Sequence, residues 1–383
     1  MIETKDAMSK FAEIVENRHD YARDWKKRTG GKILGYFCTY VPEEILYAVD
    51  VLPVRILGSH EPQDVTERHI YSMFCPFCRD CLAQGLQGRY EYLNGIAMSH
   101  TCLHIRQTFA SWVLHVPTID KFDYYISMPA KPQSPRAKPF LIKELHAFVK
   151  AVEAWTGKTI TDKDLDRGID IVDTNRRLMH QVYETRKADK PPVSGTECMQ
   201  MVVASQSMDK AEQNVMLKKL LDEEIPQRKV TKETGTRLII IGSEDDDTEF
   251  LRMTEEMGAT VVTDDHCTGS RYFWKEILPK EDRIEAIADR YIDKIPCPEK
   301  DWEGRRRWDH IRELVDDYNV QGALVIQQKF CDPHEFDIPP LMNMLKEEKD
   351  IPCLFLEFDV TVPAGQFSTR IEAFLETLEL GAL

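Results

Sequence analysis

The sequence predicts an α/β protein with two parallel-sheet domains joined by a helical segment. Short apolar runs alternate with helical patterns in residues 1–137, and the same alternation returns in residues 231–383. This rhythm is typical of βαβ units, whose parallel strands are covered on both faces and are therefore apolar throughout. Residues 138–230 show helical spacing of apolar residues instead. We expect these three ranges to be an N-terminal domain, a helical segment and a C-terminal domain.

Four apolar runs predict the strands of the N-terminal domain, at residues 32–38, 52–57, 95–98 and 124–128. A helix is expected to begin between the first two runs, at Pro42, Glu43 and Glu44. Proline fits the first turn of a helix, and carboxylates are favoured at the positive end of the helix dipole.

The middle segment predicts helices over residues 140–155, 162–186 and 197–224, with breaks at 156–158 and 190–195. The α/β rhythm then resumes with a helix expected over residues 248–257. The strands of the C-terminal domain are predicted at residues 237–242, 260–263, 322–327 and 352–357.

Composition excludes several classes of function. The formal net charge of −15 over 383 residues argues against nucleic-acid binding, because a phosphate backbone attracts positive surface. No run approaches the roughly 18 apolar residues that a membrane span needs. The first residues contain no apolar segment of the kind that directs secretion, so we expect a cytoplasmic protein.

Ten cysteines are the most informative residues of the chain. Thiols in an intracellular protein stay reduced, so clustered cysteines indicate metal or redox chemistry rather than disulfides. Cys75, Cys78 and Cys81 share a Cys-x-x-Cys-x-x-Cys motif, Cys102 lies in a polar turn, and Cys331 precedes Asp-Pro. These cysteines indicate an iron–sulfur protein.

The positions of the cysteines along the chain support this interpretation. Cys38, Cys102, Cys267 and Cys331 each follow a predicted strand closely. In open α/β sheets, ligands bind beyond the carboxyl ends of the strands. Cys102 and Cys331 are therefore candidate ligands, whereas Cys38 and Cys267 either line the cleft or pack structurally.

Each cysteine assignment has an alternative. The triple motif lacks the fourth Cys-Pro of a ferredoxin cluster run, so ligands from elsewhere must complete any site. A single buried cysteine often acts as a small apolar residue, which is what we expect of Cys198, Cys297 and Cys353. Zinc is the rival metal, although paired Cys-x-x-Cys knuckles at structural-zinc spacing are absent from the sequence.

Other standard motifs are missing from the sequence. It contains no Gly-x-Ser-x-Gly elbow, no Gly-x-Gly-x-x-Gly fingerprint and no Walker loop. The chain is therefore not expected to bind ATP or a dinucleotide by a standard route.

Seven motifs follow one another along the chain, at residues 35–44 (GYFCTYVPEE), 54–58 (VRILG), 74–76 (FCP), 101–106 (TCLHIR), 264–271 (DDHCTGSR), 328–333 (QKFCDP) and 352–359 (PCLFLEFD). In this order and spacing they resemble the motifs of the 2-hydroxyacyl-CoA dehydratase and benzoyl-CoA reductase family. The resemblance runs from about residue 32 to residue 359.

The resemblance implies two Rossmann-like domains with helical additions and a [4Fe–4S] cluster in the cleft between them. Three cysteines bind the cluster in the family, and they match Cys75, Cys102 and Cys331 here. One iron would then keep an open position. Cys78 and Cys81 go beyond that set, and they either support a larger or linked cluster or merely pack nearby.

The resemblance also implies partners and a reaction. Electrons would pass from reduced ferredoxin to an ATP-hydrolysing activator, then to this chain and a homologous sister subunit, then to the acyl-CoA substrate. The motifs at 74–81 and 264–274 favour the smaller catalytic subunit of a benzoyl-CoA reductase, which adds electrons and protons to the ring of benzoyl-CoA. The alternatives are a 2-hydroxyacyl-CoA dehydratase subunit, a non-catalytic electron-transfer subunit and a zinc-stabilised α/β protein.

Candidate proton donors or thioester contacts are Glu43, Glu44, His100 and His104. Each has a structural alternative, because Glu44 also suits the first turn of a helix and His104 also suits a solvated surface.

Overall fold

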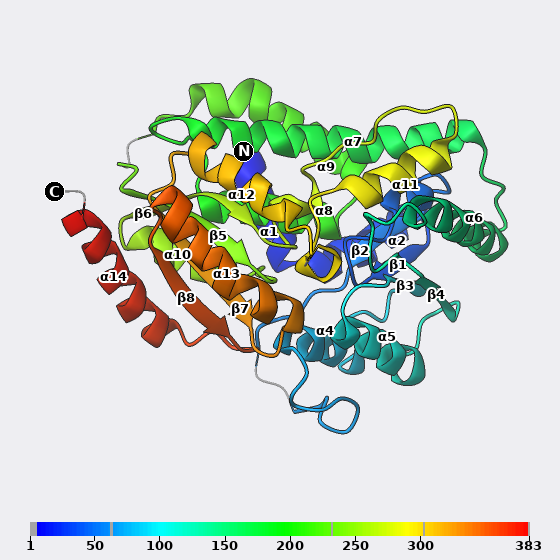
Figure 1. Ribbon diagram of the computed structural model, residues 1–383. Helices are drawn as coiled ribbons and strands as arrows, with labels where there is room; N and C mark the ends of the chain where they lie inside the picture. Colours follow the sequence, from blue (N-terminus) through cyan, green and yellow to red (C-terminus); the bar gives the residue numbers. More distant parts are fainter. Residues whose placement is uncertain (1–5, 62–63, 231–232, 302, 382–383) are drawn as a thin grey trace.

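The computed structural model consists of two parallel sheets with helices around them (Figure 1). It describes residues 6–61, 64–230, 233–301 and 303–381. The first sheet has the strand order β2-β1-β3-β4 and the second has the order β6-β5-β7-β8. Every strand pair in both sheets is parallel. The predicted α/β fold with two parallel-sheet domains is therefore confirmed.

The elements fall into three consecutive groups along the chain. The first group is α1 (Ala7–Glu16), α2 (Arg18–Thr29), β1 (Ile33–Tyr36), α3 (Glu43–Tyr47), β2 (Leu52–Arg55), α4 (Pro76–Leu86), β3 (Gly95–Ser99), α5 (Leu103–His115) and β4 (Phe122–Ile126). The helical group is α6 (Ala137–Thr156), α7 (Asp162–Glu184), α8 (Gly195–Ser207) and α9 (Lys210–Lys219). The last group is β5 (Thr236–Gly242), α10 (Thr248–Glu256), β6 (Ala259–Asp265), α11 (Arg283–Asp293), α12 (Arg306–Asp317), β7 (Gly322–Gln328), α13 (Asp332–Lys349), β8 (Cys353–Phe358) and α14 (Ala364–Gly381).

All eight predicted strands are present, because buried parallel strands leave short apolar runs that the sequence shows directly. The single helix predicted over residues 197–224 is wrong. Helix α8 ends before Met208, whose backbone is extended, and the Asp209 side chain caps α9 by accepting a hydrogen bond from the Ala211 amide. Apolar spacing continues across this break, so periodicity alone did not reveal it.

Helix α8 connects the two sheets, because it contacts both β2 and β6 and is buried along nearly its whole length. Helix α11 also crosses between the halves. Although it belongs to the range 231–383, it packs on α6, and Ile287 and Tyr291 join the apolar core beneath the first sheet. The Tyr291 hydroxyl oxygen lies 3.1 Å from the Val41 carbonyl oxygen. The two sheets are thus held by shared helices as well as by their loops.

Within the described residues, no helix is both long enough and apolar enough to span a bilayer.

Candidate functional site

A cavity of about 100 Å³ lies where the carboxyl ends of the two sheets meet. The segments that follow β1 and β3 line it from the first sheet, and those that follow β5, β6 and β7 line it from the second. Seven of the ten cysteines are among its lining residues, and all ten are free thiols. The seven are Cys38, Cys75, Cys78, Cys102, Cys267, Cys297 and Cys331.

The four cysteines singled out as cluster ligands, Cys75, Cys78, Cys102 and Cys331, all line this cavity. Three of them occupy the residue immediately before a helix. Cys75 is the N-cap of α4, Cys102 is the N-cap of α5 and Cys331 is the N-cap of α13. A helix N-terminus carries partial positive charge and favours thiolate over thiol. Three helices therefore direct their positive ends at one group of sulfur atoms.

Local sequence explains why these helices begin where they do. Pro76 follows Cys75 directly, and Pro333 lies in the first turn after Cys331. Proline cannot donate a backbone hydrogen bond, and the first turn is the part of a helix that needs no such donor. The Cys102 thiol instead caps its own helix, since its sulfur accepts a hydrogen bond from the Ile105 amide at 3.4 Å.

The thiols influence one another's protonation. A hydrogen bond with Cys78 lowers the pKa of Cys102 despite its burial. Hydrogen bonds with Cys102 and Cys75, together with burial, raise the pKa of Cys78 well above its usual value. Burial, reinforced by Cys75 and Cys102, also raises the pKa of Cys331. Several sulfur atoms thus share a buried space in which a second thiolate is unfavourable without a cation.

His104 lies directly beside this group of thiols but does not line the cavity. Its Nδ1 accepts a hydrogen bond from the Cys75 amide at 3.1 Å, and its ring packs on Phe74 with centroids 4.6 Å apart. On the outer side, Nε2 lies 3.9 Å from an Asp332 carboxylate oxygen. In this position His104 holds the backbone of Cys75 in place.

Glu44 is fully buried and is not among the residues that line the cavity. Its carboxylate pairs with Arg176 at 2.6 Å and accepts a hydrogen bond from Tyr291 at 3.1 Å. Burial would raise the pKa of Glu44, but Arg176 and Arg290 outweigh it, and the pKa lies below its usual value. The structure does not bring Glu44 and the thiols together, and a catalytic role for this residue stays a prediction.

Two further cysteines differ in their relation to the cavity, because Cys81 lies outside it and Cys297 lies inside it. Cys81 is fully buried on α4, where its thiol lies 3.5 Å from the Ile56 carbonyl, and it does not line the cavity. Cys297, which we expected to be structural, does line it. The signal that was available is the Cys297-Pro298 pair, since Pro298 begins a short helical turn in the same way that Pro76 begins α4.

Sequence reasoning also missed the polar residues of the cavity. Arg55 ends β2, Glu244 follows β5 and Gln328 ends β7, and all three line the cavity. Arg55 binds Gln206 at 2.6 Å and the Cys267 carbonyl at 2.9 Å. The available signal was their place at the carboxyl ends of strands, where a charged residue is out of keeping with an apolar run.

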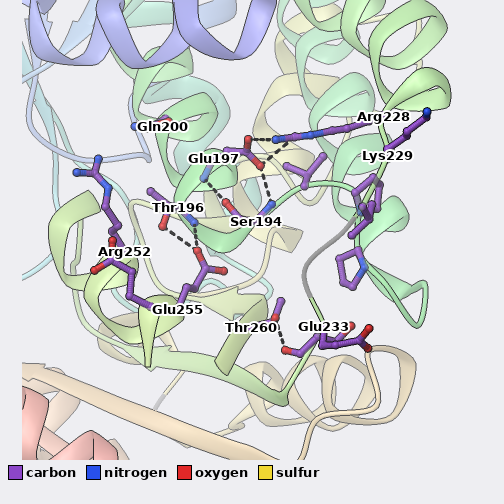
Figure 2. Close-up of a pocket in the computed structure, with 16 residues that line it drawn as sticks. Ser194, Thr196, Glu197, Gln200, Arg228, Lys229, Glu233, Arg252, Glu255 and Thr260 are labelled. Carbon is purple, nitrogen blue, oxygen red and sulfur yellow. Dashed lines mark hydrogen bonds and ion pairs between the residues drawn. The ribbon is translucent and has the colours of Figure 1, made fainter. Parts of the chain in front are cut away.

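A larger cavity, of about 520 Å³, lies away from the thiols at the start of α8 (Figure 2). Several of its polar side chains bind one another. Glu197 pairs with Arg228, and Glu255 accepts hydrogen bonds from the Gly195 amide at 2.7 Å and the Thr196 hydroxyl at 2.8 Å. These interactions account for the start of α8 and need no ligand.

Two parallel sheets with a thiol-lined cavity between their carboxyl ends define the class of this protein as an α/β protein with a candidate site of buried thiols. Comparison with known proteins identifies the family of the chain. The family model described as 2-hydroxyglutaryl-CoA dehydratase, D-component, matches residues 38–378, and the chain belongs to this family. The resemblance noted in the sequence is confirmed.

Three relatives illustrate the range of the family. The (R)-phenyllactyl-CoA dehydratase beta subunit of Clostridium sporogenes is 28% identical over 376 residues, which cover 96% of this chain and 97% of the relative. One benzoyl-CoA reductase subunit, from Thauera aromatica, is 24% identical over 352 residues, with 90% of each chain covered. The (R)-2-hydroxyglutaryl-CoA dehydratase beta subunit of Acidaminococcus fermentans is 23% identical, covering 92% of this chain and 94% of the relative. All three are named as subunits, so this chain is similar to components of multi-subunit enzymes.

Proposed function

We propose that this chain is the iron–sulfur-bearing subunit of a 2-hydroxyacyl-CoA dehydratase. The observation that carries the proposal is the gathering of Cys75, Cys78, Cys102 and Cys331 in one buried cavity at three helix N-termini. The substrate class is inferred from the relatives, because two of the three described above are named as dehydratases of 2-hydroxyacyl-CoA thioesters.

The residues of the cavity fit an iron–sulfur cluster. Thiolates are the ligands that hold such clusters, and each thiolate binds a different iron atom. Among the described residues, no three His, Cys, Asp or Glu side chains are placed to bind a single metal ion. We assign Cys75, Cys102 and Cys331 as ligands of a [4Fe–4S] cluster, with Cys78 as a fourth ligand or a hydrogen-bond donor to the other thiolates. Cys38, Cys267 and Cys297 offer further thiols should the cluster be larger.

The apolar and cationic surroundings suit this cofactor. When bound, a cluster of this kind supplies single electrons at low potential, and exclusion of water together with hydrogen bonds to sulfur tunes that potential. Phe37, Phe77 and Ile105 line the cavity with apolar surface. Arg55 lies 3.5 Å from the Cys267 sulfur and brings positive charge to the same space.

Benzoyl-CoA reduction, the reaction that the sequence motifs favoured, is the second candidate. It is supported by the benzoyl-CoA reductase relative at 24% identity. The two reactions differ in their demand for electrons. A reductase consumes electrons in proportion to its product, whereas a dehydratase recycles an electron and needs only a small input.

The proposed partners are a homologous sister subunit, an ATP-hydrolysing activator and reduced ferredoxin. Support for a sister subunit comes from the names of the relatives, each of which is one part of a larger enzyme. Exposed apolar side chains next to the cysteines fit the same view, because Leu103 follows Cys102, Phe330 precedes Cys331, and both are exposed. Exposed large apolar residues at a functional site are common where another protein binds.

Iron analysis of cysteine variants tests the cofactor assignment. We expect Cys75→Ala, Cys102→Ala and Cys331→Ala each to lose most of the iron and sulfide of the anaerobically purified complex. The control is Cys353→Ala, which removes a thiol on β8 outside the cavity and should retain iron. Full iron in all three ligand variants would refute the assignment.

Electron stoichiometry tests the reaction. The complex is supplied with a limiting amount of reduced donor and ATP, together with (R)-phenyllactyl-CoA or benzoyl-CoA. Many turnovers of the hydroxyacyl thioester per electron support the dehydratase. Two electrons consumed per benzoyl-CoA product would instead establish the reductase.

A further inference from the structure

Glu244 is the residue of the cavity that the cluster assignment leaves unexplained. It follows β5 at the carboxyl end of the second sheet and lines the cavity together with the thiols. The residue is only 4% exposed, yet neither carboxyl oxygen has a hydrogen-bond partner within the described part of the chain. Buried polar atoms are almost always hydrogen-bonded, so an unpartnered pair of oxygens facing a cavity calls for a partner that these residues do not supply, such as water, an ion or a ligand.

The surroundings of Glu244 favour the neutral acid. Burial raises the pKa of Glu244 well above its usual value, and the nearby Asp246, Cys267 and Asp245 raise it further, while Arg55 opposes them. Among the described residues, Arg55 makes its hydrogen bonds to Gln206 and Cys267 and makes none to Glu244. A carboxyl group kept neutral in this way can donate a hydrogen bond or a proton at neutral pH.

A second polar group lies beside it. The Gln328 side-chain nitrogen donates to the backbone carbonyl of Glu244 at 3.2 Å. Gln328 also lines the cavity, and its side-chain oxygen has no partner among the described residues. Glu244 and Gln328 thus add polar groups to a cavity whose lining is otherwise made largely of thiols and apolar side chains.

We propose that Glu244 is the general acid of the site, donating its proton to the 2-hydroxyl oxygen of the acyl-CoA as that oxygen leaves. The inference rests on the proposed function. In the dehydration the C–O bond breaks, and the oxygen takes the Glu244 proton and departs as water. The proton that the acyl chain loses from its neighbouring carbon returns to the carboxylate. The net change is the loss of one water with no net change in electrons.

The test uses Glu244→Gln and Asp245→Asn in the anaerobically purified complex. Asp245 is the matched control because it is the next residue, is completely buried and does not line the cavity, and because burial raises its own pKa, so that asparagine replaces a neutral acid and leaves the charge around Glu244 unchanged. We expect both variants to keep their iron. Glu244→Gln should lower kcat by at least about 100-fold, the usual contribution of a general acid, whereas Asp245→Asn should stay near the parent protein.

An infrared measurement separates an acid from a structural hydrogen bond. At neutral pH the parent protein should show a protonated-carboxyl C=O band that Glu244→Gln lacks. Adding (R)-phenyllactyl-CoA, the substrate of the electron-stoichiometry test, should shift this band in the parent and in Asp245→Asn. Glu244→Asp, which keeps the acid on a shorter chain, should restore part of the turnover that Glu244→Gln loses.

The outcomes separate this inference from the proposed function. Parent-like kcat in Glu244→Gln, or the absence of a protonated band assignable to Glu244, overturns the role of Glu244 while leaving the dehydratase standing. A complex that contains no iron, or that turns over no 2-hydroxyacyl-CoA, overturns both.

Discussion

Several charged side chains of this protein are buried and bind groups on other elements. Lys210 is an example, being 1% exposed. Its ammonium donates to Glu43 at 2.8 Å and to the Ser205 carbonyl at 2.6 Å. Glu43 also accepts hydrogen bonds from Tyr36 at 3.0 Å and from Tyr272 at 2.7 Å. This network joins α3, α9 and the turn after β6.

Removing the cation should therefore be costly. We expect Lys210→Met to lower the free energy of unfolding by about 3–5 kcal/mol, because it leaves the Glu43 carboxylate buried without a counter-charge. Urea denaturation of the parent and variant measures the difference. The control is Lys131→Met, which breaks an exposed pair with Glu303 and should cost no more than about 1 kcal/mol. Equal losses in the two variants would contradict the argument.

The cysteines show which single residues of the site could be predicted from the sequence. Spacing and neighbouring residues singled out the motif of Cys75, Cys78 and Cys81 together with Cys102 and Cys331. The structure places all of these except Cys81 in one cavity. The polar residues of that cavity were not predicted. Glu244 stands in an acidic run that also suits a solvated loop, and only its burial distinguishes it.

Secondary-structure elements approach one another closely where α7 crosses α3. Gly168 on α7 makes this approach possible, because a Cβ atom there would lie 2.1 Å from the Glu44 carbonyl oxygen and 3.1 Å from the Ala48 nitrogen. Both of these are backbone atoms, which cannot move aside as a flexible side chain does. The glycine therefore sets the distance between the two helices.

Gly168→Ala should push α7 away from α3. We expect a loss of about 1–3 kcal/mol in the free energy of unfolding, the usual cost of overpacking. Gly365→Ala is the control, since it lies in the first turn of α14 with no atom within 4 Å of the added methyl group. That variant should be neutral or slightly more stable. The prediction fails if thermal or urea unfolding ranks the two variants the other way.

The molecule as a whole depends on contacts that join its two sheets. His60, in the loop after β2, bonds Asp246, in the loop after β5, at 2.6 Å. Burial would lower the pKa of His60, but Asp246, Asp247 and Asp80 outweigh it and raise the pKa to about 10. The imidazolium is therefore charged at neutral pH and pairs with the carboxylate across the interface between the two halves.

This pair should make stability depend on pH in a defined direction. A pKa raised by folding contributes stability that is complete below the unfolded value of 6.5 and is lost as pH rises through about 10. The stability advantage of the parent protein over His60→Gln should thus fall between these two pH values. Urea denaturation at several pH values measures it, and Asp246→Asn should abolish the same dependence. A constant difference over this range would show that the pair is not charged.

The sequence by itself determined the positions of the strands, the parallel α/β fold class and the choice of Cys75, Cys102 and Cys331 as candidate ligands. These features depend on local apolar runs, turn residues and short motifs. Only the tertiary structure decided that Cys38, Cys267, Cys297 and Glu244 share a cavity with those thiols. It also decided that α11 packs on α6 and joins the core beneath the first sheet, and that Glu44 belongs to a buried ion pair. The physical reason is that side chains from distant segments meet only through the relative orientation of the two sheets. Helices α8 and α11 make contacts in both halves of the molecule, and the periodicity of a helix does not show which elements it will contact.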